Sequence, residues 1–170
     1  MDQHSDQILA TLRQIIRAID LHSKSLTKRY GLTGPQLMIL KELRRHENLT
    51  IGRLAKNVSL SQATVTTILD RLEKLDFLRR IRNTEDKRKV NIQLTQKAEE
   101  VIDTDPSLLQ EEFIHRFEKL EEWEKTLLLS SLQRIATMMN AEGIRSQPVL
   151  DSGPLETNDR EFAQYLEDSE

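Results

Sequence analysis

The chain has 170 residues and contains no cysteine, which excludes disulfides, thiolate metal sites and thiol redox switches. Its 37% hydrophobic and 31% charged residues are typical of a globular protein rich in helix-favouring side chains. No apolar run approaches the roughly 20 residues that span a bilayer, and the first residues lack a secretion signal, so we expect a cytoplasmic protein that does not enter the membrane.

The charged residues are divided unevenly along the chain, whose net charge is −3. Residues 1–40 carry five basic and three acidic groups, and residues 41–97 carry fourteen basic and seven acidic groups. Residues 98–170 carry six basic and eighteen acidic groups. This asymmetry favours a nucleic-acid face in the middle of the chain and an acidic C-terminal region.

The first two predicted elements are helices joined by a short connection. Apolar residues at helical spacing predict a helix over residues 6–30 that stops at Gly31. Thr33 is the expected N-cap of a second helix, with Pro35 in its first turn. The apolar residues expected to face inward from the second helix are Leu37, Leu40 and Leu43.

Two shorter helices follow, with the spacing of a helix-turn-helix over residues 51–70. Thr50 and Ser61 are the expected N-caps, and the turn falls around Ser59 and Leu60. The apolar residues of the pair are Ile51, Leu54, Ala55, Val58, Val65, Ile68, Leu69, Leu72 and Leu75. The second helix also has short hydrogen-bonding side chains on its outer face, which would let it enter a major groove. The DNA contacts that we expect from this helix are Ser61, Gln62, Thr64, Thr66, Thr67 and Arg71.

Residues 77–82 and 90–94 are predicted to form two strands of a small hairpin, which must pack on the helices to be stable. Thr95 is the expected cap of a fifth helix that is interrupted near Pro106. Apolar spacing predicts a sixth helix over residues 120–138. The fold class is therefore mainly α with a small β-hairpin.

The hairpin tip, residues 83–89 (NTEDKRK), contains the densest charge cluster of the chain. A solvated tip is the simplest interpretation, but a basic loop directly after a recognition helix favours a wing that enters a minor groove. We expect Lys87, Arg88 and Lys89 to contact DNA and Asp86 to orient the Arg88 guanidinium.

Three stretches, LTGPQLMILKEL, LAKNVSLSQATVTTILDRLEKLDFLRR and DKRKVNIQLT, resemble the MarR family of bacterial winged helix-turn-helix regulators. The resemblance covers roughly residues 6–140 and implies an obligate homodimer that binds double-stranded DNA at a pseudo-palindromic operator, most often as a repressor without a cofactor. Two features depart from the family pattern. Asp76 stands where many members have Gly, so Asp76 would have to adopt a left-handed backbone. The acidic extension beyond residue 145 is also long.

The resemblance divides the chain into an N-terminal dimerisation helix (1–32), a winged-helix lobe (33–97), C-terminal dimerisation helices (98–145) and an acidic tail (146–170). The residues that we expect in the dimer interface are Ile8, Leu12, Ile15, Trp123, Leu128 and Ile135. A narrower resemblance, in RQIIRAIDLHSKSL followed by GLTGPQL, is to the MarR-type regulators of compatible-solute (ectoine-type) genes called CosR and EctR. It implies control of osmolyte synthesis or uptake, and leaves the effector unknown.

Other functions have less support in the sequence. A winged-helix module that binds protein instead of DNA remains the alternative function. The surface of such a module would be expected to expose aromatic or leucine side chains. No catalytic motif appears, and the four histidines lack metal-ligand spacing, so we expect neither an enzyme nor a metal site. The polar stripe on the first helix is either a solvated face or the lining of a cleft; it consists of Arg13, Arg17, Asp20 and Lys24.

The acidic tail has one basic and seven acidic groups and is broken by Pro and Gly. Such composition is typical of disorder. A short apolar face after a possible cap at Asn158 nevertheless suggests that the end of the tail docks on the protein; this face consists of Phe162, Tyr165 and Leu166.

Overall fold

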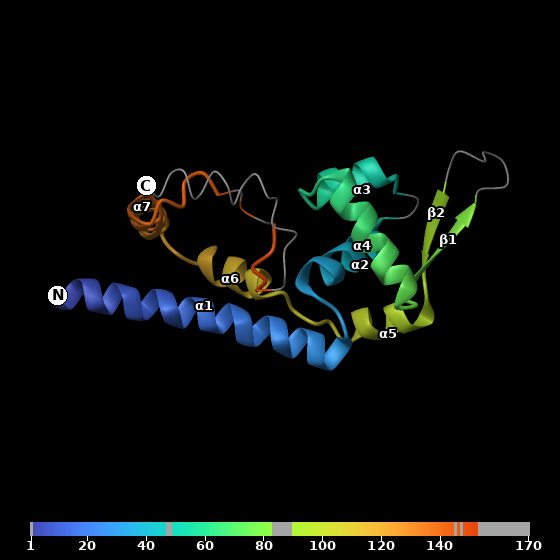
Figure 1. The fold of residues 1–170 in the computed structure, drawn as a ribbon, viewed down its shortest axis with the longest axis horizontal. Helices are drawn as coiled ribbons and strands as arrows, with labels where there is room; N and C mark the ends of the chain where they lie inside the picture. The colour runs from blue at the N-terminus through green and yellow to red at the C-terminus, as the bar shows by residue number, and fades with distance from the viewer. Residues whose placement is uncertain (1, 47–48, 83–89, 145, 147, 153–170) are drawn as a thin grey trace. The chain divides into compact units, whose positions relative to one another are not determined.

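The structure is a computed structural model that describes residues 2–46, 49–82, 90–144, 146 and 148–152. Within these ranges it contains seven α-helices and one antiparallel two-stranded sheet, which confirms the predicted fold class (Figure 1). The chain forms two compact units, Met1–Leu109 with Pro148–Ser152 and Gln110–Gln147 with Gly153–Glu170. Among the described helices, none is long and apolar enough to cross a membrane.

The first helix, α1 (Gln3–Tyr30), is longer than predicted at its N-terminal end. It stops where the sequence indicated, because Gly31 adopts a left-handed backbone with φ of 68° and its N–H donates to Thr27 O at 2.9 Å. Most of α1 is exposed within its own unit. Its buried residues are Ser23 and Leu26.

Side-chain caps fix the starts of the next three helices: α2 (Gly34–Arg45), α3 (Ile51–Asn57) and α4 (Gln62–Lys74). The Thr50 hydroxyl accepts the Arg53 N–H at 3.3 Å, and the Ser61 hydroxyl accepts the Thr64 N–H at 3.0 Å. Thr33 begins α2 in a capping box. All three predicted caps are therefore confirmed.

One hydrophobic core joins α2, α3 and α4 to the elements that follow. Its fully buried members include Leu37 and Leu40 of α2, Leu54 of α3, and Val65 and Leu69 of α4. Leu75 is 42% exposed because the helix ends at Lys74 and the chain leaves the helical periodicity there.

The strands β1 (Leu78–Arg82) and β2 (Val90–Leu94) pair in antiparallel register, from Leu78 opposite Leu94 to Arg82 opposite Val90. The hairpin lies at one end of the winged-helix lobe, beside α4 and α5 (Figure 1). Asp76 precedes it with φ of 59°, which confirms the predicted left-handed turn. The Asp76 carbonyl accepts the Thr95 hydroxyl at 2.8 Å and so joins the start of the hairpin to its end.

Thr95 caps α5 (Gln96–Asp103) as predicted, and Ala98 and Ile102 are buried in the same core as α2 and α4. The predicted interruption near Pro106 is present, because α5 ends at Asp103 and Asp105 has a positive φ of 47°. A separate helix, α6, begins after it at Leu109.

The second unit contains most of α6 (Leu109–Phe117) and all of α7 (Glu122–Met138). Within the described chain, neither helix has a buried residue. The large apolar side chains that they and the next residue expose are Phe113, Ile114, Trp123, Leu127, Leu128, Leu129, Leu132, Met138 and Met139. A helix that exposes this much apolar surface requires a partner surface to cover it.

Candidate nucleic-acid interface

A tight turn joins α3 to α4 and sets the angle between them. Ser59 has φ of 54°, and the Leu60 N–H donates back to Ala55 O at 3.0 Å. Ala55 is buried at 4% exposure, so a small side chain lies where the turn folds back on α3. A hydrogen bond of 2.6 Å from Asn57 Nδ2 to Glu42 Oε1 further fixes α3 to α2. The turn therefore presents α4 on a rigid support.

The outer face of α4 is polar, as expected. Ser61, Gln62, Thr66 and Arg71 are exposed, whereas Thr64 and Thr67 are half-buried. The Thr66 hydroxyl donates to Gln62 O at 2.8 Å, and the Thr67 hydroxyl donates to Ala63 O at 3.1 Å. Since each hydroxyl has one proton and two lone pairs, these threonines present acceptors outward. Acceptors in a major groove pair with the amino groups of adenine or cytosine.

Gln62 lies against Gly52, a contact that the sequence analysis missed. A Cβ atom built at Gly52 would lie 3.2 Å from Gln62 Nε2. The absence of a side chain at Gly52 therefore leaves room for the Gln62 amide, the group best suited on α4 to bidentate contact with adenine. The sequence contains one indication of this contact, which is a glycine inside a seven-residue helix. Glycine weakens a helix, so its presence there indicates a need for space.

Arg80 of β1 joins the hairpin to α4, and its role was also missed. Arg80 Nη1 lies 2.5 Å from Asp70 Oδ1 and 3.3 Å from Glu73 Oε2, both on α4. The Arg80 side chain is 26% exposed. Its Nη2 is buried and makes no hydrogen bond to any residue that the structure describes. The strand that carries the wing is thus clamped by charge to the helix that precedes it.

The predicted wing contacts and their clamp fall on residues 83–89, outside the described residues. These are Asp86, Lys87, Arg88 and Lys89. The structure brings the two strands that lead to them into register beside α4, and places five of the six expected contacts on α4, with Ser61 as its N-cap.

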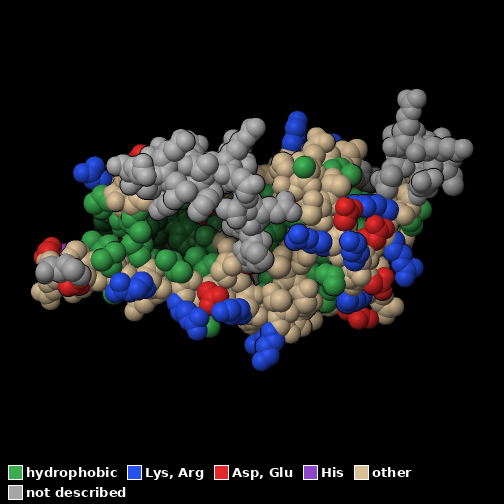
Figure 2. Space-filling view, viewed as in Figure 1, with side chains coloured by type: hydrophobic (Ala, Val, Ile, Leu, Met, Phe, Trp, Pro, Cys, Tyr) green, Lys and Arg blue, Asp and Glu red, His purple; other side chains and the backbone are tan. Residues whose placement is uncertain are grey.

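The expected dimer residues are largely exposed within the single chain. Exposed fractions are 44% for Ile8, 47% for Ile15, 68% for Trp123 and 43% for Leu128, whereas Leu12 and Ile135 are half-buried. Figure 2 shows hydrophobic side chains at the molecular surface around α6 and α7. These side chains are available to a second surface.

The polar stripe of α1 is paired internally. Asp20 Oδ2 lies 3.0 Å from Lys24 Nζ and 2.7 Å from Arg17 Nη1. The hydrogen bond from Lys24 and the two positive charges lower the pKa of the Asp20 carboxyl below its ordinary value of 3.8, against the opposing effect of desolvation. The carboxylate is therefore charged at neutral pH and offsets part of the positive charge of Arg17 and Lys24.

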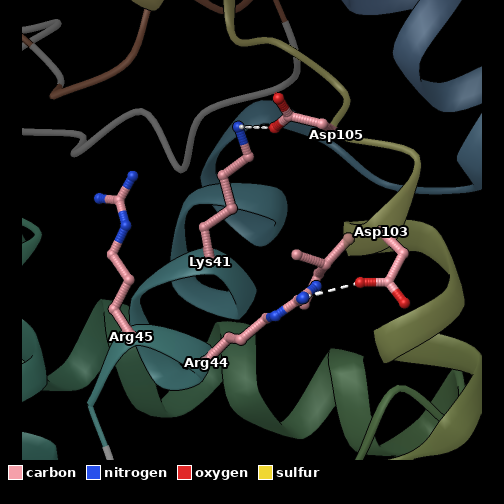
Figure 3. Close-up of a pocket in the computed structure, with 6 residues that line it drawn as sticks. Lys41, Arg44, Arg45, Asp103 and Asp105 are labelled. Carbon is pink, nitrogen blue, oxygen red and sulfur yellow. Dashed lines mark ion pairs between the residues drawn. The ribbon is translucent and has the colours of Figure 1, made fainter.

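A pocket of about 450 Å³ lies between the C-terminal half of α2 and the end of α5. Lys41 Nζ lies 3.6 Å from Asp105 Oδ1, and Arg44 Nη2 lies 2.7 Å from Asp103 Oδ1, while Arg45 points away from both pairs (Figure 3). The Arg44–Asp103 pair ties α2 to α5, and the Lys41–Asp105 pair ties α2 to the turn that follows α5. Within the described residues, no three His, Asp or Glu side chains gather as a metal site would require.

The chain is similar to known proteins in sequence and in fold. The MarR family model matches residues 32–90, from the start of α2 to the start of β2. The chain is 28% identical over 133 residues to the uncharacterized HTH-type transcriptional regulator YsmB of Bacillus subtilis (strain 168), covering 78% of this chain and 91% of YsmB. It is 31% identical over 103 residues to the HTH-type transcriptional regulator MgrA of Staphylococcus aureus, covering 59% of this chain and 70% of MgrA. The crystal structure of a MepR-like protein complexed with pseudoligands is similar, with a TM-score of 0.54 and 27% identity, and the match covers 81% of this chain and 97% of that one.

Proposed function

Because the chain belongs to the MarR family, we propose that it is a homodimeric, sequence-specific DNA-binding regulator of transcription that acts as a repressor. The observation that carries the proposal is the outer face of α4, where α3 supports a row of exposed hydroxyl and amide groups. The surrounding residues 41–97 have twice as many basic as acidic groups, which favours the phosphate backbone as partner. The relatives named as HTH-type transcriptional regulators support the same assignment.

In this proposal α4 enters the major groove and the wing enters the adjacent minor groove. Gln62, Thr66 and Thr67 discriminate between bases, whereas Ser61, Thr64 and Arg71 lie nearer the phosphates. Lys87, Arg88 and Lys89 respond to groove width and charge, with Asp86 as the clamp of Arg88. The absence of aromatic side chains from α4 argues against the alternative of a protein-docking module.

The proposed dimer interface is formed by α1 together with α6 and α7. The exposed apolar side chains of α7, including Trp123 and Leu128, support this assignment because surface of this kind is normally covered in solution. Two lobes related by a twofold axis would read half-sites about one helical turn, roughly 10 bp, apart. Sedimentation of wild type and Leu128→Asp tests the interface. We expect a dimer for the first and a monomer for the second.

We further propose that the target genes serve compatible-solute synthesis or uptake. The support is the resemblance of the α1 and α2 sequence to regulators of such genes. Titration of operator binding against salt and a panel of osmolytes tests this part. Binding that responds to salt only through ordinary counterion release, with no effect of any osmolyte, would leave the protein a regulator of other genes.

DNA binding is tested by fluorescence anisotropy with DNA from upstream of the protein's own gene. We expect wild type to bind this DNA more tightly than a scrambled duplex, and Gln62→Ala to lose most of that preference. Gln96→Ala is the matched control, because Gln96 is exposed at the start of α5 and hydrogen-bonds to Glu100 at 2.9 Å. Equal binding to all duplexes by wild type would contradict sequence-specific regulation. No binding to any DNA would favour the protein-interaction module.

A further inference from the structure

A short segment that follows α7 in sequence returns to the corner between α1 and α2. Pro148–Ser152 belongs to the same compact unit as these helices. Val149 is 5% exposed and is part of the hydrophobic core. Asp151 Oδ2 accepts the Gly34 N–H of α2 at 2.9 Å, and the Ser152 N–H donates to Ser23 Oγ of α1 at 3.1 Å. The segment therefore contacts both helices, through apolar and polar atoms.

The contact with Asp151 completes the N-terminus of α2. The first N–H groups of any helix lack partners within the helix. In α2, Pro35 has no N–H, Gln36 belongs to the capping box with Thr33, and the Leu37 N–H donates to Thr33 O at 3.0 Å. Gly34 is left, and Asp151 accepts its N–H. The first turn of α2 has no acidic residue of its own, so Asp151 also supplies the negative charge that a helix N-terminus favours.

The fit at Gly34 is close. A Cβ atom at this position would lie 3.0 Å from Val149 Cγ1 and 3.1 Å from Asp151 Oδ2. Both distances are tighter than nine in ten real Cβ contacts, so a methyl group at this position would require Val149 and Asp151 to shift by a few tenths of an ångström. The docked segment therefore fits closely against α2 as well as against α1.

The segment adds to a narrow attachment between α1 and the rest of its unit. Ser23 and Leu26 are the buried residues of α1, and Gly31 ends the helix three residues before α2 begins. Ser152 hydrogen-bonds to one of these two buried residues, while Asp151 holds the first residue of α2. A chain that bonds to both sides of a corner limits rotation at the connection between them.

We propose that the α1–α2 corner is a docking site for the chain's own residues 148–152, and that the docked segment is a latch that fixes the direction of α1 relative to the winged-helix lobe. The effect of the latch on DNA rests on the proposed function, in which α1 belongs to the dimer and the lobe to the operator complex. With the latch released, the two lobes must be ordered when they bind, and that loss of freedom weakens the complex.

Two substitutions one residue apart form the matched test in the full-length protein. Val149→Asp places a charge in the core and releases the latch. Leu150→Asp adds the same charge to a side chain that is 45% exposed and leaves the latch docked. Asp151→Ala and Gly34→Ala test the same contact from its two sides. In every variant the hydrogen exchange of the amide at position 34 reports docking, and anisotropy with operator DNA reports the effect of docking on DNA binding.

We expect exchange of the Gly34 amide to accelerate at least tenfold in Val149→Asp and Asp151→Ala, and to stay at the wild-type rate in Leu150→Asp. We expect the amide at position 34 in Gly34→Ala to exchange faster than in wild type as well. We also expect Val149→Asp to bind operator at least threefold more weakly than Leu150→Asp. Unchanged exchange in Asp151→Ala would overturn the docking site. If exchange accelerated in Val149→Asp but this variant bound operator as tightly as Leu150→Asp, the latch would be overturned. If wild type bound no DNA, the proposed function would fail while the exchange result still decided the docking site.

Discussion

Glu73, in the last turn of α4, accepts the backbone N–H of Arg80 in β1 at 3.1 Å. The same carboxylate contacts the Arg80 guanidinium at 3.3 Å, so one side chain holds both the backbone and the side chain of the strand. A shift of the strand would break both bonds together. The helix proposed to read the major groove and the strand that leads to the wing are therefore positioned as one body.

Replacing Arg80 should lower the free energy of unfolding. Arg80→Ala leaves Asp70 and Glu73 close together without their cation, and we expect a loss of about 1–2 kcal/mol, moderated by solvent because both carboxylates are at least 39% exposed. Arg79→Ala is the control, since Arg79 is 73% exposed and its Nη2 lies 3.8 Å from Asp76; we expect a change below about 0.5 kcal/mol. Urea denaturation at equal protein concentration measures both, and equal losses would show that the clamp contributes nothing specific.

Filling the space at Gly52 should separate stability from recognition. Gly52→Ala favours the α3 helix by up to about 1 kcal/mol, while its new methyl group pushes the flexible Gln62 side chain from its position. We expect stability to be kept or increased and discrimination among operator variants to fall. Gln62→Ala provides the control background, because Gly52→Ala should then have no further effect on discrimination. A full additional loss in the double variant would mean that Gly52 acts through another residue.

The left-handed turn before β1 should prefer glycine to alanine. At Asp76, with φ of 59°, a side chain strains the backbone, whereas glycine adopts this conformation freely. We expect Asp76→Gly to be about 1 kcal/mol more stable than Asp76→Ala in urea denaturation, despite the greater freedom of glycine in the unfolded chain. Both variants lose the exposed pair with Arg79, so that pair does not enter the comparison. Equal stability of the two variants would mean that the backbone relaxes at no cost.

Arg88, in the part of the hairpin outside the described residues, should contribute affinity that depends little on operator sequence. We expect Arg88→Ala to weaken binding by about 1–3 kcal/mol and to lower the slope of log affinity against log salt by about one. Lys119→Ala is the control for loss of one exposed cation elsewhere, and should change neither quantity measurably. Affinity of Arg88→Ala equal to that of the control at moderate salt would argue against the wing.

The sequence predicted the elements whose causes are local. Thr50, Ser61 and Thr95 cap helices because a hydroxyl reaches an N–H three residues ahead, and this distance is readable in the chain. The clamp of Arg80 was not readable, because it depends on where β1 lies against α4. The docking of Val149 was even harder to predict from the sequence, since the segment has no periodicity and its partners are distant in sequence. A sequence also cannot tell whether an apolar stripe such as that of α7 is covered by its own chain or by another.

The hydrogen bond between Gly34 and Asp151 joins residues 117 positions apart. During synthesis of the chain it can therefore form only some time after α2 has been made. At translation rates of about 5–20 residues per second, Asp151 is added roughly 6–23 s after Gly34. Apart from Val149, the buried residues of the core lie between Leu26 and Leu108, so all of them have been added before Asp151. On the ribosome, the lobe can fold while the N-terminus of α2 is still exposed to water, and the latch closes only after residues 148–152 have been made. A nascent chain that has not yet reached residue 148 therefore differs at this corner from one that includes the segment.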